Sequence, residues 1–193
     1  MDKLQIRTGF WLILSLIILV LPLPWVCALM LSSTVHECAH FAALRFMGVS
    51  VRGVILRSGG AVLETRELTP IQGLISTLAG PCGAILLVFF FRSIPRTALC
   101  ALIQSAYHLL PVVPLDGGRA LDHLVSYFGW DRRICAVTEW LCLLTLVLVG
   151  MRLSFLGVGI PVSLFCVLIL ARVLYEKYLA NRFGNEYNRC TKP

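Results

Sequence analysis

Long apolar stretches separated by short polar connections run through most of this chain. Six stretches can be marked, at residues 9–23, 25–47, 70–91, 94–115, 134–151 and 155–174. A helix needs about 20 mainly apolar residues to cross about 30 Å of hydrocarbon, and most of these stretches approach that length. The pattern predicts an all-α, multi-pass membrane protein with about six transmembrane helices. Pro22 and Pro24 predict a break between the first two helices, because proline interrupts a helix.

The longest polar connection, residues 48–69, has a different pattern. β-Branched residues between Val51 and Ile55 precede Gly59-Gly60, and the apolar run Ala61-Val62-Leu63 follows. Such runs on both sides of a glycine pair favour strands joined by a turn. We therefore expect a small β-hairpin or a re-entrant loop between the second and third spans.

The composition agrees with a membrane protein. Hydrophobic residues make up 58% of the chain and charged residues 14%, against about 45–50% and about 25% in typical globular proteins. The net charge of +7 does not indicate a nucleic-acid partner, because the basic residues lie between apolar stretches rather than on one amphipathic element. The eight cysteines form no C-x-x-C pair. We interpret them as small buried hydrophobic residues rather than as disulfides or thiolate ligands.

The distribution of lysine and arginine predicts the orientation of the spans. With six spans, both termini share one side with the second and fourth connections. Of the 17 Lys and Arg residues, only Arg92, Arg96 and Arg152 fall on the other side. Cytoplasmic segments carry the excess of positive charge, so both termini are expected in the cytoplasm. Residues 1–178 are expected to form a single transmembrane domain, and residues 179–193 a short cytoplasmic tail.

The second apolar stretch contains the sequence His36-Glu37-Cys38-Ala39-His40. In a helix, positions i and i+4 lie about 40° apart around the axis and about 6 Å apart along it. His36 and His40 therefore present two imidazoles on one face, which suits two bonds to one zinc ion. Glu37 takes the general-base position of an H-E-x-x-H metalloprotease. A polar contact between helices is the alternative reading of these side chains.

A catalytic zinc site needs a third protein ligand and an open position. The fourth stretch ends in a segment where Pro111 and Pro114 interrupt the helix, followed by Asp116 and then Gly117-Gly118. Asp116 is therefore expected at the cytoplasmic end of the fourth span, at a depth similar to that of His36 and His40. The weaker candidates for the third ligand are Asp122, Glu64 and Glu67.

These two motifs, in this order, resemble those of the site-2 protease family of intramembrane zinc metalloproteases (peptidase family M50). The resemblance extends from Gly9 to about Tyr178. The family's H-E-x-x-H matches His36, Glu37 and His40. Its second motif, N-x-x-P-x-x-P-x-L-D-G-G, matches Pro111, Pro114, Asp116, Gly117 and Gly118, with one residue fewer before Leu115. The Ala79-Gly80-Pro81 element is similar to a helix-packing element of the family.

The resemblance implies hydrolysis of peptide bonds within or beside the bilayer. It implies one Zn²⁺ ion held by His36, His40 and Asp116, with Glu37 as the catalytic base. Where the family has an asparagine that binds substrate or the developing oxyanion, this chain has His108. We expect His108 to donate a hydrogen bond in that role; a hydrogen bond between helices is the alternative.

The layout, without a PDZ or nucleotide-sensing CBS domain, is most similar to the bacterial sporulation branch of the family, which processes a sigma-factor precursor. The implied partners are the lipid bilayer of a bacterial cell membrane, a membrane-associated protein substrate such as a sigma-factor precursor or an anti-sigma factor, and a membrane-protein regulator. The hairpin is expected to pair its edge with an extended substrate strand; a simple connector is the alternative.

A metal transporter and an inactive scaffold are the rival interpretations. A transporter needs ligands spaced along a path, whereas the ligands predicted here converge on one point beside a general base. An inactive relative would have lost Glu37 or a ligand, and this chain has lost neither. Both considerations favour an enzyme.

Overall fold

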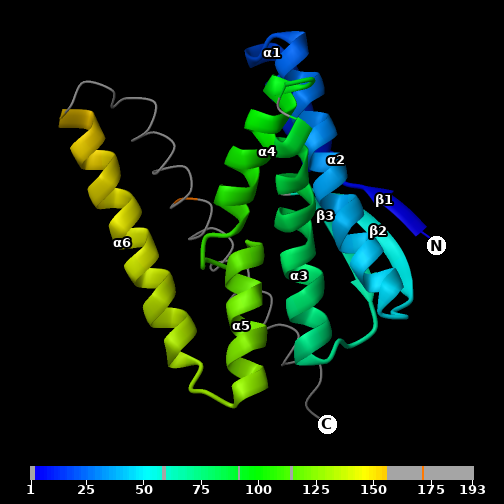
Figure 1. Cartoon of the computed structure of the whole chain (residues 1–193), viewed down its shortest axis with the longest axis vertical. Helices are drawn as coiled ribbons and strands as arrows, with labels where there is room; N and C mark the ends of the chain where they lie inside the picture. Colours follow the sequence, from blue (N-terminus) through cyan, green and yellow to red (C-terminus); the bar gives the residue numbers. More distant parts are fainter. Residues whose placement is uncertain (1–2, 58–59, 91, 114, 156–170, 172–193) are drawn as a thin grey trace.

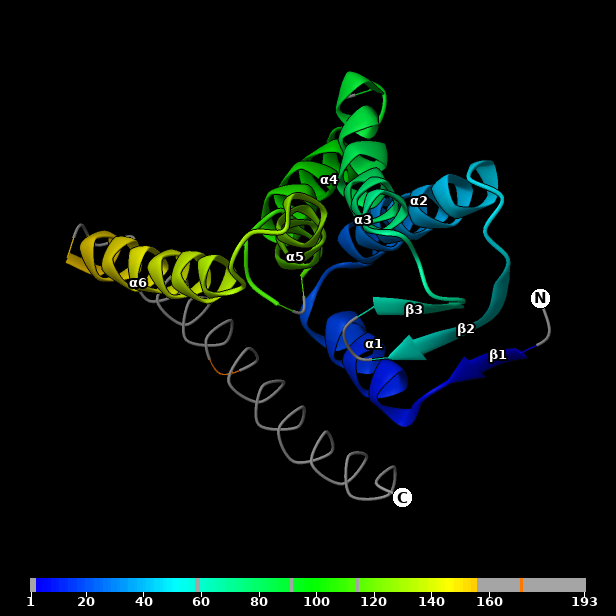
Figure 2. The same ribbon diagram turned by 90° about the horizontal axis from the view of Figure 1, so that it is seen from below.

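The computed structural model of the protein describes residues 3–57, 60–90, 92–113 and 115–155, together with residue 171. Its elements are, in order, β1 (Lys3–Ile6), α1 (Thr8–Val20), α2 (Leu23–Phe46), β2 (Val51–Arg57), β3 (Gly60–Thr65), α3 (Pro70–Ile85), the 3₁₀ helix η1 (Leu86–Phe90), α4 (Pro95–His108), α5 (Asp116–Phe128) and α6 (Arg133–Phe155). Figures 1 and 2 show α2 to α5 packed together, with a small sheet on one side and α6 on the other. Apart from residues 155 and 171, the predicted sixth span and tail lie outside the described residues.

Local sequence signals explain where several helices begin and end. The predicted break at Pro22 is confirmed, because α1 ends at Val20 and α2 begins at Leu23. Gly48 follows α2 with a φ of 69°, a conformation that glycine adopts without steric cost, and its amide donates to the Arg45 carbonyl at 3.0 Å. A capping box formed by Thr69 and Gln72 starts α3.

The connection between α2 and α3 forms a hairpin, which decides between the two predicted alternatives. β2 and β3 are antiparallel, with Arg57 opposite Gly60. The sheet has a third strand that the sequence analysis did not predict: β1 pairs in parallel with β2, with Lys3 opposite Gly53. The strand order β1-β2-β3 leaves β3 at an edge of the sheet. A buried cluster of Leu44, Val49 and Val51 holds the hairpin against the end of α2.

The helix of the fourth apolar stretch is interrupted, as Pro111 and Pro114 predict. α4 ends at His108, and Asp116 is the first residue of a separate helix, α5, rather than the end of the fourth span. The proline-containing segment between the two helices is the physical reason, because proline cannot continue the hydrogen-bond pattern of a helix. α5 was not predicted, since its sequence DGGRALDHLVSYF contains no long apolar run. It ends at Phe128 and is followed by Gly129, which has a φ of 66°.

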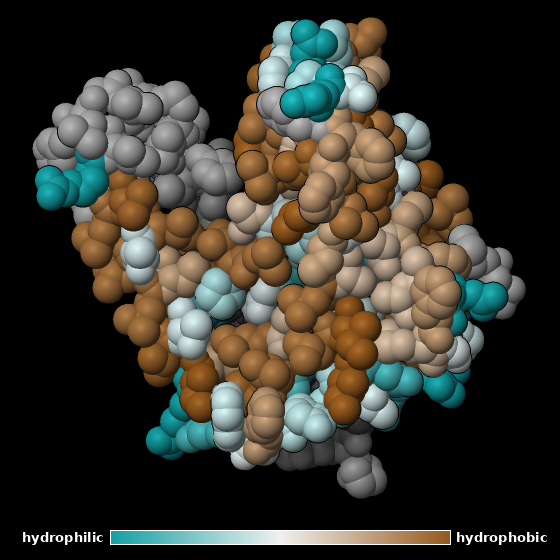
Figure 3. All heavy atoms as spheres, viewed as in Figure 1, coloured by the Kyte–Doolittle hydropathy of each residue, from teal (hydrophilic) through white to brown (hydrophobic). Residues whose placement is uncertain are grey.

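The surface is strongly apolar. Figure 3 shows hydrophobic residues across most of one face, with hydrophilic residues gathered toward its upper and lower ends. Large apolar side chains such as Leu19, Phe46 and Phe89 are more than four-fifths exposed. Among the described helices, the continuous segment Pro70–Phe90 has the length and composition to cross a membrane, whereas α1 is apolar but shorter. The count of six spans therefore stays a prediction.

Candidate metal centre and active site

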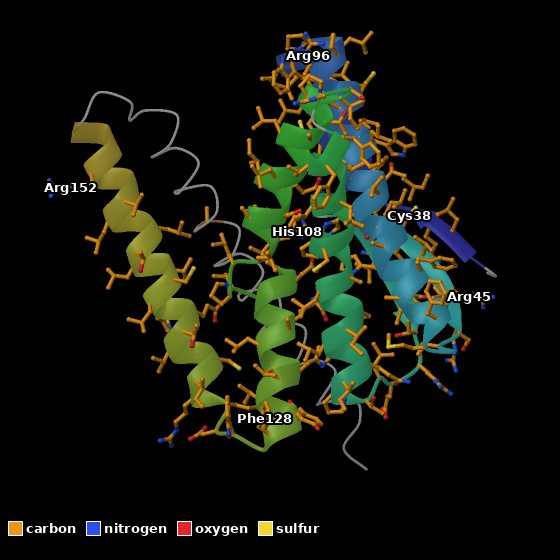
Figure 4. The ribbon with its side chains drawn as sticks, viewed as in Figure 1. Cys38, Arg45, Arg96, His108, Phe128 and Arg152 are labelled. Carbon is orange, nitrogen blue, oxygen red and sulfur yellow. The ribbon has the colours of Figure 1, made fainter. Side chains whose placement is uncertain are left out.

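The two histidines of the H-E-x-x-H sequence come from the inner face of α2. His36 is 1% exposed. Cys38, two residues later, is exposed and lies on the outer side of the helix, as Figure 4 shows. This arrangement follows from helical geometry, because residues two positions apart point to opposite sides. The spacing of the sequence thus brings His36 and His40 to one face of α2, toward the helical bundle.

His40 is oriented by α3. Its Nδ1 lies 2.6 Å from the carbonyl oxygen of Ser76. Because a carbonyl oxygen can only accept, Nδ1 carries the proton and Nε2 keeps its lone pair for a metal ion. The His40 ring also lies against Gly80, where a Cβ atom would overlap the imidazole. Gly80 therefore makes room for a candidate ligand, which explains a glycine at this position of the Ala-Gly-Pro element.

Asp116 is positioned by the turn between α4 and α5. Gly117 and Gly118 begin α5 directly against this turn, and a Cβ atom at either position would overlap backbone atoms of Leu109 or Val112. On its other side, the turn packs against Leu143 of α6 through a buried apolar cluster. Asp116, itself buried, is thereby held in place by backbone packing rather than by a mobile loop.

The three predicted ligands converge on one point. His36 Nε2 lies 3.1 Å from His40 Nε2 and 3.1 Å from Asp116 Oδ2. His40 Nε2 lies 3.5 Å from the same Asp116 oxygen. Zinc bonds of about 2.0–2.1 Å at tetrahedral angles place ligand atoms about 3.3 Å apart, so this donor set fits a zinc ion. The alternative acidic residues Asp122, Glu64 and Glu67 are not part of the group of described residues that could hold a metal.

Glu37 lies next to this centre and contacts the hairpin. Its Oε1 accepts a hydrogen bond from the backbone N–H of Ala61, at 3.1 Å, and lies close to Gly60. Glu37 and His108 both line one cavity, so both can meet a molecule that occupies it. The contact between β3 and the predicted general base was not foreseen, because no short motif links residues 37 and 61.

His108 is joined to the metal centre more directly than the sequence analysis expected. Its Nδ1 lies 2.8 Å from Asp116 Oδ2, and its ring centroid is 4.4 Å from that of His36. Figure 4 shows the His108 label at the middle of the bundle, beside α4. His108 Nδ1 is therefore engaged with Asp116, and Nε2 is the ring nitrogen that His108 can present to a substrate.

A cavity of about 390 Å³ extends from Glu37 and His108 between α1, α2 and α4. Its lining includes Gln104, which carries no motif and was not predicted as a site residue. Ser32 Oγ donates a hydrogen bond to Gln104 Oε1 at 2.7 Å. A second residue outside the prediction is Glu139, a buried carboxylate on α6. A lone acidic residue in an apolar stretch was the available signal for it.

Comparison with known proteins adds independent support. No family model matches the chain. It is 30% identical over 126 residues to a Synechocystis protein designated a zinc metalloprotease, a match covering 53% of this chain and 33% of that protein. It is 32% identical over 123 residues to Rip3 of Mycobacterium tuberculosis, also designated a zinc metalloprotease, which covers 54% of this chain and 30% of Rip3. The matched regions thus span about a third of these relatives.

The fold has a counterpart among solved structures. The site-2 protease from Methanocaldococcus jannaschii superposes with a TM-score of 0.58, at 19% sequence identity, and 85% of each chain is covered. This likeness concerns the arrangement of the helices and the small sheet. The chain is thus similar in sequence to two zinc metalloproteases and similar in fold to a site-2 protease, and its His36, His40 and Asp116 converge where a metal ion could be held.

Proposed function

We propose that this protein is an intramembrane zinc metalloprotease that hydrolyses peptide bonds in membrane-associated proteins. The observation that carries the proposal is the convergence of His36, His40 and Asp116, with Glu37 beside them, inside a bundle whose surface is largely apolar. A bare cluster of ionisable groups would be costly in an apolar medium, whereas a bound cation offsets that cost. Ligands at a single point beside a general base favour catalysis over transport.

Each residue has a separate task in the proposed reaction. The two histidines and Asp116 would hold a zinc ion, which would polarise the scissile carbonyl and the attacking water. Glu37 accepts the water's proton and passes it to the leaving amine. Since Ala61 N–H donates to Glu37 Oε1, Oε2 is the oxygen available for that proton. His108 fixes Asp116 by donating from Nδ1, and as the imidazolium it can also donate from Nε2 to the substrate.

The edge of the hairpin is the proposed place where a helical substrate becomes extended. A helical substrate shields its carbonyl groups in its own hydrogen bonds, so an extended segment must form before attack. β3 is an edge strand, and its Ala61 N–H points to Glu37 rather than to β2. A substrate strand paired along the outer edge of β3 would therefore pass beside the general base.

The location and substrates are part of the same proposal. We place the protein in a bacterial cell membrane as a multi-pass protein, with residues 1–178 as one metalloprotease domain and both termini in the cytoplasm. Regulated intramembrane proteolysis of a sigma-factor precursor or an anti-sigma factor is the proposed role, with a membrane-protein regulator controlling it. The excess of Lys and Arg on one side of the predicted spans supports the orientation.

The test uses purified protein in lipid vesicles with a panel of single-span peptides, each with about 20 apolar residues. We expect cleavage that stops when zinc is chelated and returns when zinc is added. Asp116→Asn should lower both bound zinc and cleavage, because a neutral amide is a poorer zinc ligand than a carboxylate. Zinc-loaded parent protein that cleaves none of the peptides would contradict the proposal. Zinc uptake into the vesicles without cleavage would favour a transporter.

A further inference from the structure

The cavity beside the metal centre has an apolar part and a polar part. Its apolar walls include Phe10, Ile13 and Ile17 of α1 and Leu29 of α2. Its polar part consists of Ser33, Glu37, Gln104, Tyr107 and His108. Because the cavity ends at the general base, whatever fills it lies next to the reacting bond. An extended polypeptide suits this lining, since it offers apolar side chains and backbone carbonyls together.

Gln104 is oriented so that its amide group can bind an extended polypeptide in the cavity. Ser32, which is fully buried on α2, donates from Oγ to Gln104 Oε1 at 2.7 Å. That bond fixes the side chain and leaves the two N–H groups of Nε2 without a hydrogen-bond partner among the described residues. A carboxamide that lines a cavity and keeps its donors free is suited to bind a carbonyl oxygen.

The spacing along α4 matches that of an extended chain. Gln104 precedes His108 by four residues, so the two side chains share one face of α4 about 6 Å apart along its axis. Two residues of an extended strand span about 6.6 Å, and their carbonyl groups point in the same direction. A strand lying along α4 could therefore meet Gln104 and His108 with carbonyl groups two residues apart.

We infer that Gln104 is a substrate-positioning residue. Its Nε2 donates to a backbone carbonyl of the extended substrate, two residues along from the carbonyl group nearest His108. The cavity accepts an apolar side chain of the same substrate. This inference rests on the proposed protease function and adds the subsite that grips the substrate. The hydrogen bond from Gln104 is present equally in the enzyme–substrate complex and in the transition state. Its loss therefore weakens substrate binding and leaves the chemical step unchanged.

The test compares Gln104→Met with the parent on the peptide panel in vesicles. Methionine keeps the length of the side chain but has no donor. Losing one neutral hydrogen bond predicts a KM increase of about 3- to 10-fold, with kcat within about twofold of the parent. Gln104→Glu, which keeps the acceptor for Ser32 and loses the N–H groups, should show the same rise in KM. Gln5→Met, the same substitution at an exposed residue of β1 that is not among the residues lining the cavity, is the matched control and should leave KM unchanged.

A measurement without turnover separates binding from catalysis. Peptide affinity is measured in the Glu37→Gln background with and without Gln104→Met, and bound zinc is measured in every variant. The inference is overturned if KM and peptide affinity are the same with and without Gln104, or if Gln104→Met loses zinc, which would make its role structural. Those results leave parent cleavage intact, so the proposed function would stand. A parent that cleaves no peptide overturns the function, and the inference with it.

Discussion

At the scale of single residues, the proposed mechanism assigns metal binding and proton transfer to different side chains. His36, His40 and Asp116 supply three converging ligand atoms, while Glu37 is held one position away by a backbone N–H of β3. The two tasks should therefore respond to different substitutions, and each can be tested without disturbing the other.

Glu37→Gln should abolish cleavage and leave zinc bound. The amide oxygen can still accept the hydrogen bond from Ala61, so the hairpin contact survives, but the amide cannot take a proton. Loss of the base predicts a fall in kcat toward the upper end of about 10²–10⁴-fold. Zinc stoichiometry and cleavage rate are measured on the same preparation. Cleavage near the parent rate would remove Glu37 from the mechanism.

His108→Ala should weaken zinc binding as well as activity. The side chain lies 2.8 Å from Asp116 Oδ2, and removing a partner that orients a metal ligand lowers metal affinity by about 10–100-fold. Competition with a chelator of known affinity measures the change. His108→Asn, which retains a side-chain donor, should keep more activity than the alanine variant. Unchanged zinc affinity in His108→Ala would show that the contact with Asp116 does not orient the ligand.

At the scale of helices and strands, the sequence predicted those features that depend on local signals. The break at Pro22, the face of α2 that carries His36 and His40, and the hairpin after Gly48 each follow from neighbouring residues. β1 could not be predicted, because its four residues gain their structure only from β2, whose paired residues lie 50 positions further along the chain. α5 was missed because its apolar residues recur on one face and do not form the long apolar run that marked the other helices.

The candidate site also has features that follow from local sequence signals and features that do not. The ligands on α2 come from a helical repeat that can be read directly, and Asp116 from its place after two prolines. The contacts of Glu37 with Ala61 and of Ser32 with Gln104 join residues that no repeat or motif connects, and the motif that contains both His108 and Asp116 does not predict the contact between them. Such contacts depend on how the helices pack, which a single sequence does not specify.

The contact between α2 and α3 gives a prediction for Gly80→Ala. The added methyl group would overlap the His40 ring and push it from its place, so zinc affinity should fall by about 10-fold or more. Gly73→Ala, on the same helix, is the matched control. There the methyl group would overlap the ring of His123 on α5, which is not a metal ligand. Both variants should lose thermal stability, and a zinc affinity equally reduced in both would contradict a specific role for Gly80.

At the scale of the whole molecule, the orientation in the membrane stays a prediction, and two features of the structure bear on it. Figure 4 places Arg96 and Arg152 higher in the view than Arg45. The pairing of β1 with β2 also places the segment before α1 on the same side as the connection between α2 and α3. Both features are expected if α1 and α2 cross the membrane as an antiparallel pair.

Reporter fusions test this orientation. A reporter fused after residue 193 should read as cytoplasmic, and one fused after Ser93, in the connection between η1 and α4, as extracytoplasmic. The cut in the substrate is then expected near the cytoplasmic end of its membrane segment. An extracytoplasmic signal from the fusion after residue 193 would reverse the orientation and the expected position of the cut.

The parallel pairing of β1 with β2 also bears on the order in which the protein assembles during synthesis. Lys3 pairs with Gly53, and the intervening chain contains both α1 and α2. At about 5–20 residues per second, a ribosome needs about 3–10 s to add those residues. For that time β1 has no strand to pair with, while α1 and α2 can already form. The first strand to be made thus joins the sheet only after two helices, whereas the β3 segment beside Glu37 is made soon after β2 and before the helices that carry His108 and Asp116.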